Sequence, residues 1–310
     1  VKKVDFNRYP DPYAKEVCAL FAAYYGVSPE LVTAGNGSDE LIGVLVGAFL
    51  EKGDRLVVTE PDFSMYAFYA YLSEIECIAV AKDDGMHVDV AAVLDAVRQS
   101  GARAVMLSNP CNPTSVGLDR EEVRRLVEGT DALVILDEAY MDFWDQSFLA
   151  EAAGYDNLVV LKTCSKAFGM AALRLGFAVA NERITTALRA AKSPYNVNAV
   201  TQAAAKAVLS DPAFLKSRAV KLINARRFLE EELRELAKKT NQITEIYESC
   251  TNFVFFSSPK AEEIYTELLE CGIAVRKMGA FIRVTAGSMD ENRAFLSSLQ
   301  QILTGEAPTQ

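Results

Sequence analysis

Two charged residues follow apolar segments, at positions where a solvated charge is unexpected. Lys166 comes after the apolar run of residues 158–161, and Asp137 comes after the apolar run of residues 132–136. Unpaired charges at the ends of buried strands are costly, so these side chains call for a functional explanation. A lysine held between Ser165 and an aromatic-bearing segment suits an amine that attacks a carbonyl group.

The two residues together indicate one kind of cofactor chemistry. An electron-sink cofactor such as pyridoxal phosphate needs a lysine that forms a Schiff base and an acidic partner for its pyridinium nitrogen. Lys166 and Asp137 supply both groups, each at the end of a predicted strand. We therefore predict a pyridoxal-phosphate site at this end of the sheet.

Four polar segments occur at predicted strand ends or helix starts: residues 35–40, 109–114, 137–140 and 163–166. Any one of them alone would suit turn or capping chemistry. In an open parallel sheet, however, ligands bind beyond the carboxyl ends of the strands, and four such segments predict one shared site. The first segment opens a helix, for which Ser38 is the expected N-cap. Free backbone N–H groups there and the Arg174 guanidinium would bind an anion.

A competing interpretation is a nucleoside triphosphatase, because residues 133–138 resemble its magnesium-binding strand. That class also needs a GxxxxGK[ST] loop, and neither Gly-Lys-Ser nor Gly-Lys-Thr occurs in the sequence. We set this interpretation aside.

Composition narrows the remaining function classes. The net charge of −10 argues against nucleic acid or an anionic membrane as the main partner. A single histidine, His87, excludes a histidine-rich metal site, and we predict no metal. The six cysteines form no CxxC pair, which is typical of reduced thiols in a cytoplasmic protein. No signal peptide or membrane-spanning run is apparent.

The order of predicted elements indicates two domains. From residue 32 to 180, strands at 55–59, 75–81, 103–108, 133–136, 158–161 and 175–180 alternate with helices at 63–72, 89–99 and 119–128. This alternation predicts an α/β domain, residues 1–195, with a mainly parallel sheet between helices. Helices at 199–209, 212–239, 260–271 and 289–303 and strands at 243–247, 252–256 and 281–285 predict a smaller α+β domain, residues 196–310.

Eight motifs, in order along nearly the whole chain, resemble those of fold-type-I pyridoxal-phosphate-dependent aminotransferases. They are Arg8-Tyr9-Pro10, Gly37-Ser38-Asp39-Glu40, Asp62-Phe63-Ser64-Met65-Tyr66, Asn112-Pro113-Thr114, Asp137-Glu138-Ala139-Tyr140, Ser165-Lys166-Ala167-Phe168, Leu173-Arg174-Leu175-Gly176 and Ile282-Arg283-Val284-Thr285. Within that family, the first and third motifs resemble the histidinol-phosphate group most.

The resemblance implies a role for each motif residue. Lys166 would bind the cofactor as a Schiff base and shuttle the substrate proton, Asp137 would hold the ring nitrogen, and Asn112 and Tyr140 would bind the ring hydroxyl. Phe63, where the family usually has tyrosine, would stack on the ring. Arg283 would clamp the substrate carboxylate. The implied phosphate ligands are Ser38, Asp39, Thr163, Ser165, Arg174 and, from a partner subunit of a homodimer, Tyr9.

The sequence departs from the family pattern at several places. Ser115 and Ala172 replace glycines that the family usually has beside the Asn-Pro-Thr and Leu-Arg motifs. An upstream Asn-Glu-Asn stretch is absent from the sequence, and residues 275–280 are short for the family. Both of these segments contact substrate in the family, so the resemblance constrains the substrate less than the cofactor.

We thus predict a cytoplasmic aminotransferase that uses L-histidinol phosphate and 2-oxoglutarate. Two alternatives keep the fold and cofactor: a threonine-phosphate decarboxylase and a broad aromatic amino-acid aminotransferase. A third alternative is a non-enzymatic regulator, whose expected signature, the loss of Lys166 or Asp137, is absent from this sequence.

Overall fold

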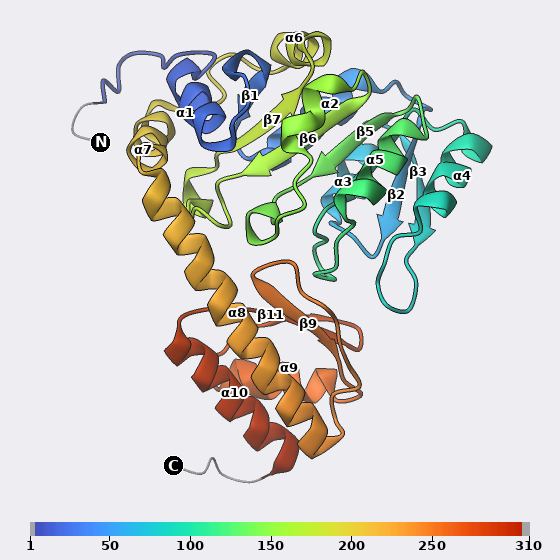
Figure 1. Ribbon diagram of the computed structural model, residues 1–310, viewed down its shortest axis with the longest axis vertical. Helices are drawn as coiled ribbons and strands as arrows, with labels where there is room; N and C mark the ends of the chain where they lie inside the picture. The colour runs from blue at the N-terminus through green and yellow to red at the C-terminus, as the bar shows by residue number, and fades with distance from the viewer. Residues whose placement is uncertain (1–3, 306–310) are drawn as a thin grey trace.

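The computed structural model describes residues 4–305 and contains a large sheet and a small sheet, each with its own helices (Figure 1). The strands of the large sheet are β1 (Val32–Gly35), β2 (Arg55–Glu60), β3 (Glu76–Ala81), β4 (Ala104–Ser108), β5 (Leu133–Asp137), β6 (Leu158–Thr163) and β7 (Gly176–Ala180), in the order β1-β7-β6-β5-β4-β2-β3. The strand β7 alone runs opposite to the others, so its pairings with β1 and β6 are antiparallel and the remaining pairings are parallel. The predicted mainly parallel α/β sheet is confirmed.

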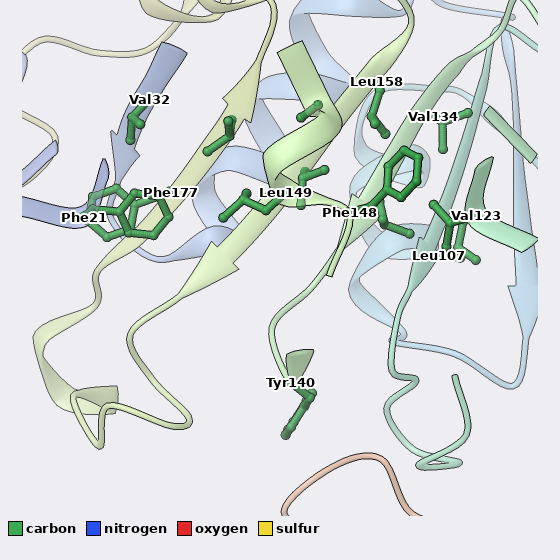
Figure 2. Packing of buried hydrophobic residues seen from close by; sticks show 14 of the residues in the cluster. Phe21, Val32, Leu107, Val123, Val134, Tyr140, Phe148, Leu149, Leu158 and Phe177 are labelled. Carbon is green, nitrogen blue, oxygen red and sulfur yellow. The ribbon is translucent and has the colours of Figure 1, made fainter. Parts of the chain in front are cut away.

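Helices cover both faces of the large sheet, because both faces of its strands are apolar. Alternate residues of the central strands, such as Val134 and Ile135 of β5, enter different cores. One core receives α1 (Lys15–Tyr25), α4 (Val90–Ser100), α5 (Arg120–Glu128) and α7 (Ala199–Leu209). The other receives α2 (Ser38–Phe49), α3 (Met65–Leu72) and α6 (Glu182–Ala191). Figure 2 shows Phe21 of α1 against Phe177 of β7, with ring centroids 4.0 Å apart.

The small sheet, in the order β10-β11-β9-β8, is antiparallel throughout. Its strands are β8 (Glu245–Ile246), β9 (Phe253–Ser257), β10 (Arg276–Met278) and β11 (Phe281–Thr285), and its helices are α9 (Ala261–Glu270) and α10 (Met289–Thr304). The predicted α+β character is confirmed. The sequence analysis did not name β1, β10, α1 or α6; the two strands, of four and three residues, are too short for a clear periodic pattern.

The long helix α8 (Pro212–Thr240) joins the two parts, running from beside α7 down to the small sheet (Figure 1). The domain boundary at residue 195/196 stays a prediction. Since α7 packs against α1 and buries Ala205 and Leu209 in the large-sheet core, we propose that the first domain extends into the start of α8.

The starts of two helices are capped differently. Asp89 caps α4, accepting hydrogen bonds from the N–H groups of Ala91 and Ala92. The prediction that Ser38 caps α2 is wrong. Gly37 is the N-cap residue, with φ of 86°, a conformation that side-chain-bearing residues rarely adopt.

Candidate active site

A cavity of about 450 Å³ opens at the carboxyl ends of the strands β4, β5 and β6, which face the small domain. Arg276 of the small sheet contributes to its wall. Ten of the twelve site residues predicted from the sequence line the cavity: Ser38, Asp39, Phe63, Asn112, Asp137, Tyr140, Thr163, Ser165, Lys166 and Arg174. The fold therefore brings together segments that lie far apart in the chain.

Asp137 is the last residue of β5 and its carboxylate is almost completely buried. Its Oδ2 accepts a hydrogen bond from the Tyr66 hydroxyl at 3.1 Å, and its Oδ1 accepts one from the Ala139 N–H at 3.0 Å. Burial raises the pKa of Asp137 to about 6, against the lowering effects of these hydrogen bonds and of Lys166. Because burial disfavours its negative charge, this carboxylate would be stabilised by a cation placed next to it.

Lys166 lies in the turn that follows β6. The turn is held by Thr163, whose Oγ1 lies 3.1 Å from the Ser165 Oγ and accepts the Ser165 N–H at 3.2 Å. The Lys166 Nζ lies 5.1 Å from the centroid of the Tyr140 ring. Tyr140 in turn packs edge-on against Phe253 of the small sheet, at the sheet edge seen in Figure 2. The amine therefore enters the cavity beside an aromatic wall.

An anion site is built at the start of α2. Because Gly37 makes no side-chain cap, the first N–H groups of α2 are left for a ligand. Glycine at 176 allows this helix end to sit on β7, since a Cβ there would lie 2.1 Å from the Ser38 backbone nitrogen. The Arg174 Nη1 lies 3.5 Å from the Ser165 Oγ at the same place. A phosphate group matches this combination of N–H groups, hydroxyls and a guanidinium.

Asp39 contributes to this site differently from Ser38. Its Oδ2 accepts a hydrogen bond from the Tyr69 hydroxyl at 3.1 Å, whereas its Oδ1 is buried and has no hydrogen-bond partner. A carboxylate repels an anion, so Asp39 can serve a phosphate only through its backbone N–H, or through a bound group that donates to the orphan Oδ1.

Arg283 lies next to the cavity rather than in its immediate lining. One guanidinium nitrogen donates to Asn112 Oδ1, the guanidinium carbon lies 4.9 Å from the Phe253 ring centroid, and the buried Nε has no partner. Burial lowers the pKa of Arg283 from its ordinary value. A partly desolvated arginine whose Nε has no partner fits a site for an anionic substrate group.

Arg276 is a site residue that the sequence analysis missed. It pairs with Arg283 across the β10–β11 ladder and lines the cavity itself. The sequence offered little signal, because Arg276 stands in a short basic segment, Val275-Arg276-Lys277, that resembles a solvated strand. Only the antiparallel register places the two residues directly opposite one another.

Tyr9 is the one predicted site residue that lies away from the cavity. It is 82 % exposed, and its ring stacks on Tyr195 with centroids 4.6 Å apart. The structure of one chain thus leaves Tyr9 free to contact something outside that chain.

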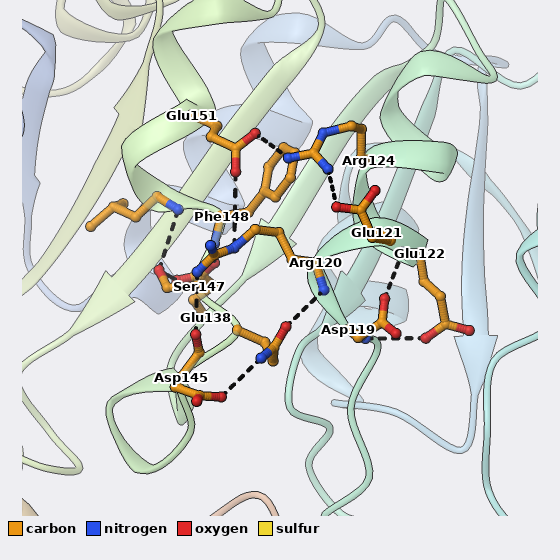
Figure 3. Close-up of polar contacts among 12 residues, drawn as sticks. Asp119, Arg120, Glu121, Glu122, Arg124, Glu138, Asp145, Ser147, Phe148 and Glu151 are labelled. Atoms are coloured by element: carbon orange, nitrogen blue, oxygen red, sulfur yellow. Dashed lines mark hydrogen bonds and ion pairs between the residues drawn. The ribbon is translucent and has the colours of Figure 1, made fainter.

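Glu138, behind the cavity, holds the turn that carries Asp137 and Tyr140. Its carboxylate accepts hydrogen bonds from the Ser147 hydroxyl and the Phe148 N–H, both at 2.6 Å (Figure 3). Lys162 of β6, also buried, lies 3.8 Å from it. This network, which lies behind the cavity, fixes the ends of β5 and β6 relative to one another.

The donor set fits a cofactor that has an aldehyde, a basic ring nitrogen and a phosphate. The Lys166 amine, the buried Asp137 carboxylate and the start of α2 match these three groups in turn. Within residues 4–305, no cluster of His, Cys, Asp or Glu side chains could hold a metal ion. In that same stretch, no helix has the length and apolarity needed to cross a membrane.

Comparisons with known proteins agree with this geometry. The family model described as "Aminotransferase class I and II" matches residues 1–299. A histidinol-phosphate aminotransferase of Clostridium kluyveri is 37 % identical over 308 residues, covering 98 % of this chain and 86 % of that protein.

Two solved structures share the fold. One is a histidinol-phosphate aminotransferase from Sinorhizobium meliloti in complex with pyridoxal-5'-phosphate, with a TM-score of 0.88 and 24 % identity over 96 % of this chain and 83 % of that one. The other is an L-threonine-O-3-phosphate decarboxylase from Porphyromonas gingivalis, with a TM-score of 0.79 and 25 % identity over 96 % and 91 % of the two chains. With a family model covering nearly the whole sequence, this chain belongs to the class I and II aminotransferases.

Proposed function

We propose that this protein is a pyridoxal-phosphate-dependent aminotransferase that uses L-histidinol phosphate and 2-oxoglutarate to form imidazole-acetol phosphate and glutamate. The convergence of Lys166, Asp137 and the α2 anion site on one cavity carries the proposal. The likeness to a histidinol-phosphate aminotransferase at 37 % identity supports the choice of substrate.

The chain's own residues would divide the chemistry among them. When bound, pyridoxal phosphate supplies an electron sink for the negative charge that develops at the substrate Cα. Asp137 would hold the ring nitrogen, Asn112 and Tyr140 the ring hydroxyl, and Phe63 would pack on the ring face. The Lys166 Nζ, once free, would take the proton from the substrate Cα and hold it, acting as general base.

The phosphate of the cofactor would be bound by the start of α2 with Ser38, Thr163, Ser165 and Arg174. Asp39 would take part through its backbone N–H. These contacts would place the ring between Lys166 and Asp137 before a substrate arrives, which lowers the entropic cost of reaction.

The paired arginines, Arg276 and Arg283, support a substrate with a strong anion. Histidinol phosphate has a phosphate and no carboxylate, whereas glutamate has a carboxylate in a comparable position relative to the amine. Two guanidinium groups side by side can bind either group with charge-assisted hydrogen bonds. We therefore assign both half-reactions to the same pair of arginines.

A half-reaction screen tests the proposal. Protein loaded with pyridoxal phosphate is mixed with one amino compound at a time, and the visible absorption of the cofactor is followed. Conversion by L-histidinol phosphate and by glutamate is expected, and none with the Lys166→Ala variant. Undiminished transaminase turnover by Lys166→Ala would contradict the assignment of this lysine.

The likeness to the P. gingivalis decarboxylase supports one second candidate. Both enzymes would act on a phosphorylated amino compound, and they differ in whether the Cα–H or the Cα–CO₂ bond breaks. Carbon dioxide release from L-threonine O-3-phosphate, without transamination of histidinol phosphate, would favour the decarboxylase.

We also propose that the protein acts in the cytoplasm as a homodimer in which sites are shared. Its free cysteines and its similarity to biosynthetic enzymes support the location. Exposed Tyr9, Tyr71 and Leu72, which are 82 %, 79 % and 60 % exposed, support association with a second copy. In that dimer, Tyr9 would reach the cofactor phosphate of the partner subunit.

A further inference from the structure

A buried pair of opposite charges lies behind the cavity wall that carries Phe63 and Asn112. The side chains of Asp62 and Lys82 are only 3 % and 1 % exposed, and the Lys82 Nζ lies 3.8 Å from the Asp62 Oδ2. Burying charges in this way is unfavourable unless they are paired and hydrogen-bonded. Lys82 stands in the charged run Lys82-Asp83-Asp84, which in the sequence resembles a solvated loop.

Asp62 holds two segments of the wall by hydrogen bonds. Its Oδ1 accepts the Phe63 N–H at 2.7 Å and also the Ser108 hydroxyl, while its Oδ2 accepts the Thr59 hydroxyl at 2.6 Å and the Ser108 N–H at 3.3 Å. The Ser108 Oγ in turn accepts the Asn112 N–H at 3.1 Å. One carboxylate thereby fixes the backbone under both Phe63 and Asn112.

Lys82 ties the same two segments together from the end of β3. Its N–H donates to the Glu60 carbonyl at 2.9 Å. Its Nζ donates to the Cys111 Sγ at 2.8 Å, next to Asn112, and the Cys111 thiol donates to the Pro61 carbonyl at 3.6 Å. The ammonium group therefore joins the loop before α3 to the loop after β4.

The charge of Asp62 also acts on Asp137, the residue that would hold the nitrogen of the cofactor ring. The groups around Asp137 are the Tyr66 hydroxyl from α3, Lys166 from the turn after β6, and Asp62 from the loop after β2. Besides burial, which is the main cause, Asp62 raises the pKa of Asp137 while Lys166 lowers it. Facing Asp62 itself are the ammonium of Lys82 and the Cys111 thiol, whose pKa burial raises.

We infer that Lys82 and Asp62 are positioning residues for the reaction. Asp62 sets the places of Phe63 and Asn112 against the cofactor ring, and Lys82 neutralises Asp62 so that its charge does not disturb the contact of Asp137 with the ring nitrogen. This inference rests on the proposed pyridoxal-phosphate chemistry and names residues that touch neither cofactor nor substrate.

The test uses charge-removing variants of similar shape: Lys82→Met, Asp62→Asn and the double variant. Each is loaded with pyridoxal phosphate, and the visible absorption of the bound cofactor is titrated with pH. A negative charge left without its partner favours protonation of nearby groups. The midpoint of this pH titration is therefore expected to rise by about half a pH unit or more in Lys82→Met. In Asp62→Asn, where the positive charge is left without its partner, the midpoint is expected to fall by a similar amount.

The double variant removes both charges, and its midpoint is expected to return close to that of the wild type. The matched control is Lys52→Met, which breaks the exposed Lys52–Glu74 pair and should leave the midpoint unchanged. Opposite shifts in the single variants are a signature that general loss of packing would not produce.

The outcomes separate this inference from the proposed function. Failure of wild-type protein to bind pyridoxal phosphate would overturn the function itself. A wild type that binds and titrates, together with single variants whose midpoints equal the wild-type value, would overturn the inference. If Lys82→Met does not fold, the Asp62→Asn midpoint decides in the same way, because that variant keeps an oxygen acceptor for the Phe63 N–H.

Discussion

Asp137 combines a functional task with a stability cost at a single residue. Its carboxylate is 4 % exposed, and burial raises its pKa to about 6. An Asp in the unfolded chain ionises near 3.9. This group therefore penalises folding as the pH rises above its unfolded pKa, and the penalty is complete above the folded pKa of about 6 and is relieved as the pH falls toward about 3.9. The protonated ring nitrogen of a bound cofactor, paired with this carboxylate, would remove the penalty at neutral pH.

Replacing this carboxylate should stabilise the cofactor-free protein while abolishing its activity. Relative to wild type, the Asp137→Asn variant should gain on the order of 1 kcal/mol in free energy of unfolding between pH 5 and pH 8, because only the wild-type protein has a carboxylate that ionises in the folded state over this range. Urea unfolding of the cofactor-free proteins measures this difference. Transaminase activity should fall by at least about 100-fold, because an amide cannot hold a ring nitrogen protonated. A stability difference that does not change with pH would contradict the assignment.

Ser115 adopts a conformation that is usually left to glycine. Its φ is 68°, yet its hydroxyl donates to the Glu248 carbonyl of the small domain at 2.8 Å, and its own carbonyl accepts the Cys250 N–H at 2.9 Å. The replacement of the family's glycine therefore retains the turn and adds a contact between the domains. Ala172, the other departure, lies in the short 3-10 helix Ala171–Leu173, where alanine is readily accommodated.

Two substitutions at Ser115 should separate backbone strain from the hydrogen bond. Ser115→Ala keeps the left-handed conformation and loses the bond, so it should lower the free energy of unfolding by about 1–2 kcal/mol. Ser115→Gly loses the bond but relieves about 1 kcal/mol of strain, so it should stay within about 1 kcal/mol of wild type. Denaturant unfolding measures the order of stability of the three proteins. An alanine variant as stable as wild type would show that the hydroxyl contributes nothing to the free energy of unfolding.

At the scale of elements, the contact between α2 and β7 shapes the anion site. The helix end can approach the strand only because residue 176 lacks a side chain. The helix α2 itself contains Gly47, at which an added Cβ would meet only the Ser73 hydroxyl, at 3.9 Å. Gly176 therefore provides a test site in the contact between α2 and β7, and Gly47 provides a control site on the same helix outside that contact.

Gly176→Ala should move the start of α2 away from the cofactor phosphate. We expect the dissociation constant for pyridoxal phosphate to rise by about 10-fold or more, as when one charge-assisted hydrogen bond is lost. Gly47→Ala should leave that constant unchanged and stabilise the helix by up to about 1 kcal/mol. Cofactor titration by absorbance and thermal unfolding measure the two effects, and equal cofactor affinity in both variants would be the contrary result.

At the scale of the whole molecule, the cavity has walls from both domains, whereas the exposed N-terminal segment with Tyr9 lies away from it. Arg276 and Arg283 come from the small sheet, whereas Lys166 and Asp137 come from the large one. Movement of one domain relative to the other would therefore change the distance between the anionic group of a substrate and the amine that removes its proton. Tyr9 extends this dependence to a second chain under the proposed dimer.

Mixed dimers test whether Tyr9 acts on the partner's site. Lys166→Ala dimers should be inactive, and Tyr9→Phe dimers should bind pyridoxal phosphate more weakly if the hydroxyl contacts the phosphate. After unfolding and refolding the two variants together, the mixed dimer would have one site with both residues intact, so cofactor affinity and activity should partly recover. Light scattering confirms that dimers have formed. If they have formed and activity does not recover, Tyr9 contacts the cofactor site of its own chain or no cofactor site at all.

Much of the site could be predicted from single residues and their neighbours. Lys166, Asp137 and Arg174 stand at the ends of apolar strands or beside them, and the polarity of those positions is visible without a structure. The alternation of strands and helices was equally clear, because strands buried on both faces form continuous apolar runs.

Contacts between segments that lie far apart in the chain depend on the tertiary structure and could not be predicted. The pairing of Arg276 with Arg283 depends on strand register, the cap at Gly37 on a backbone angle, and the burial of Lys82 on a partner twenty residues away, Asp62. None of these has a local pattern, since a charge in a loop has the same sequence signature whether it is solvated or paired in the interior. Local sequence features were enough to predict the cofactor chemistry and the class of fold. The packing of distant segments decided which side chains surround that chemistry and which charges tune it.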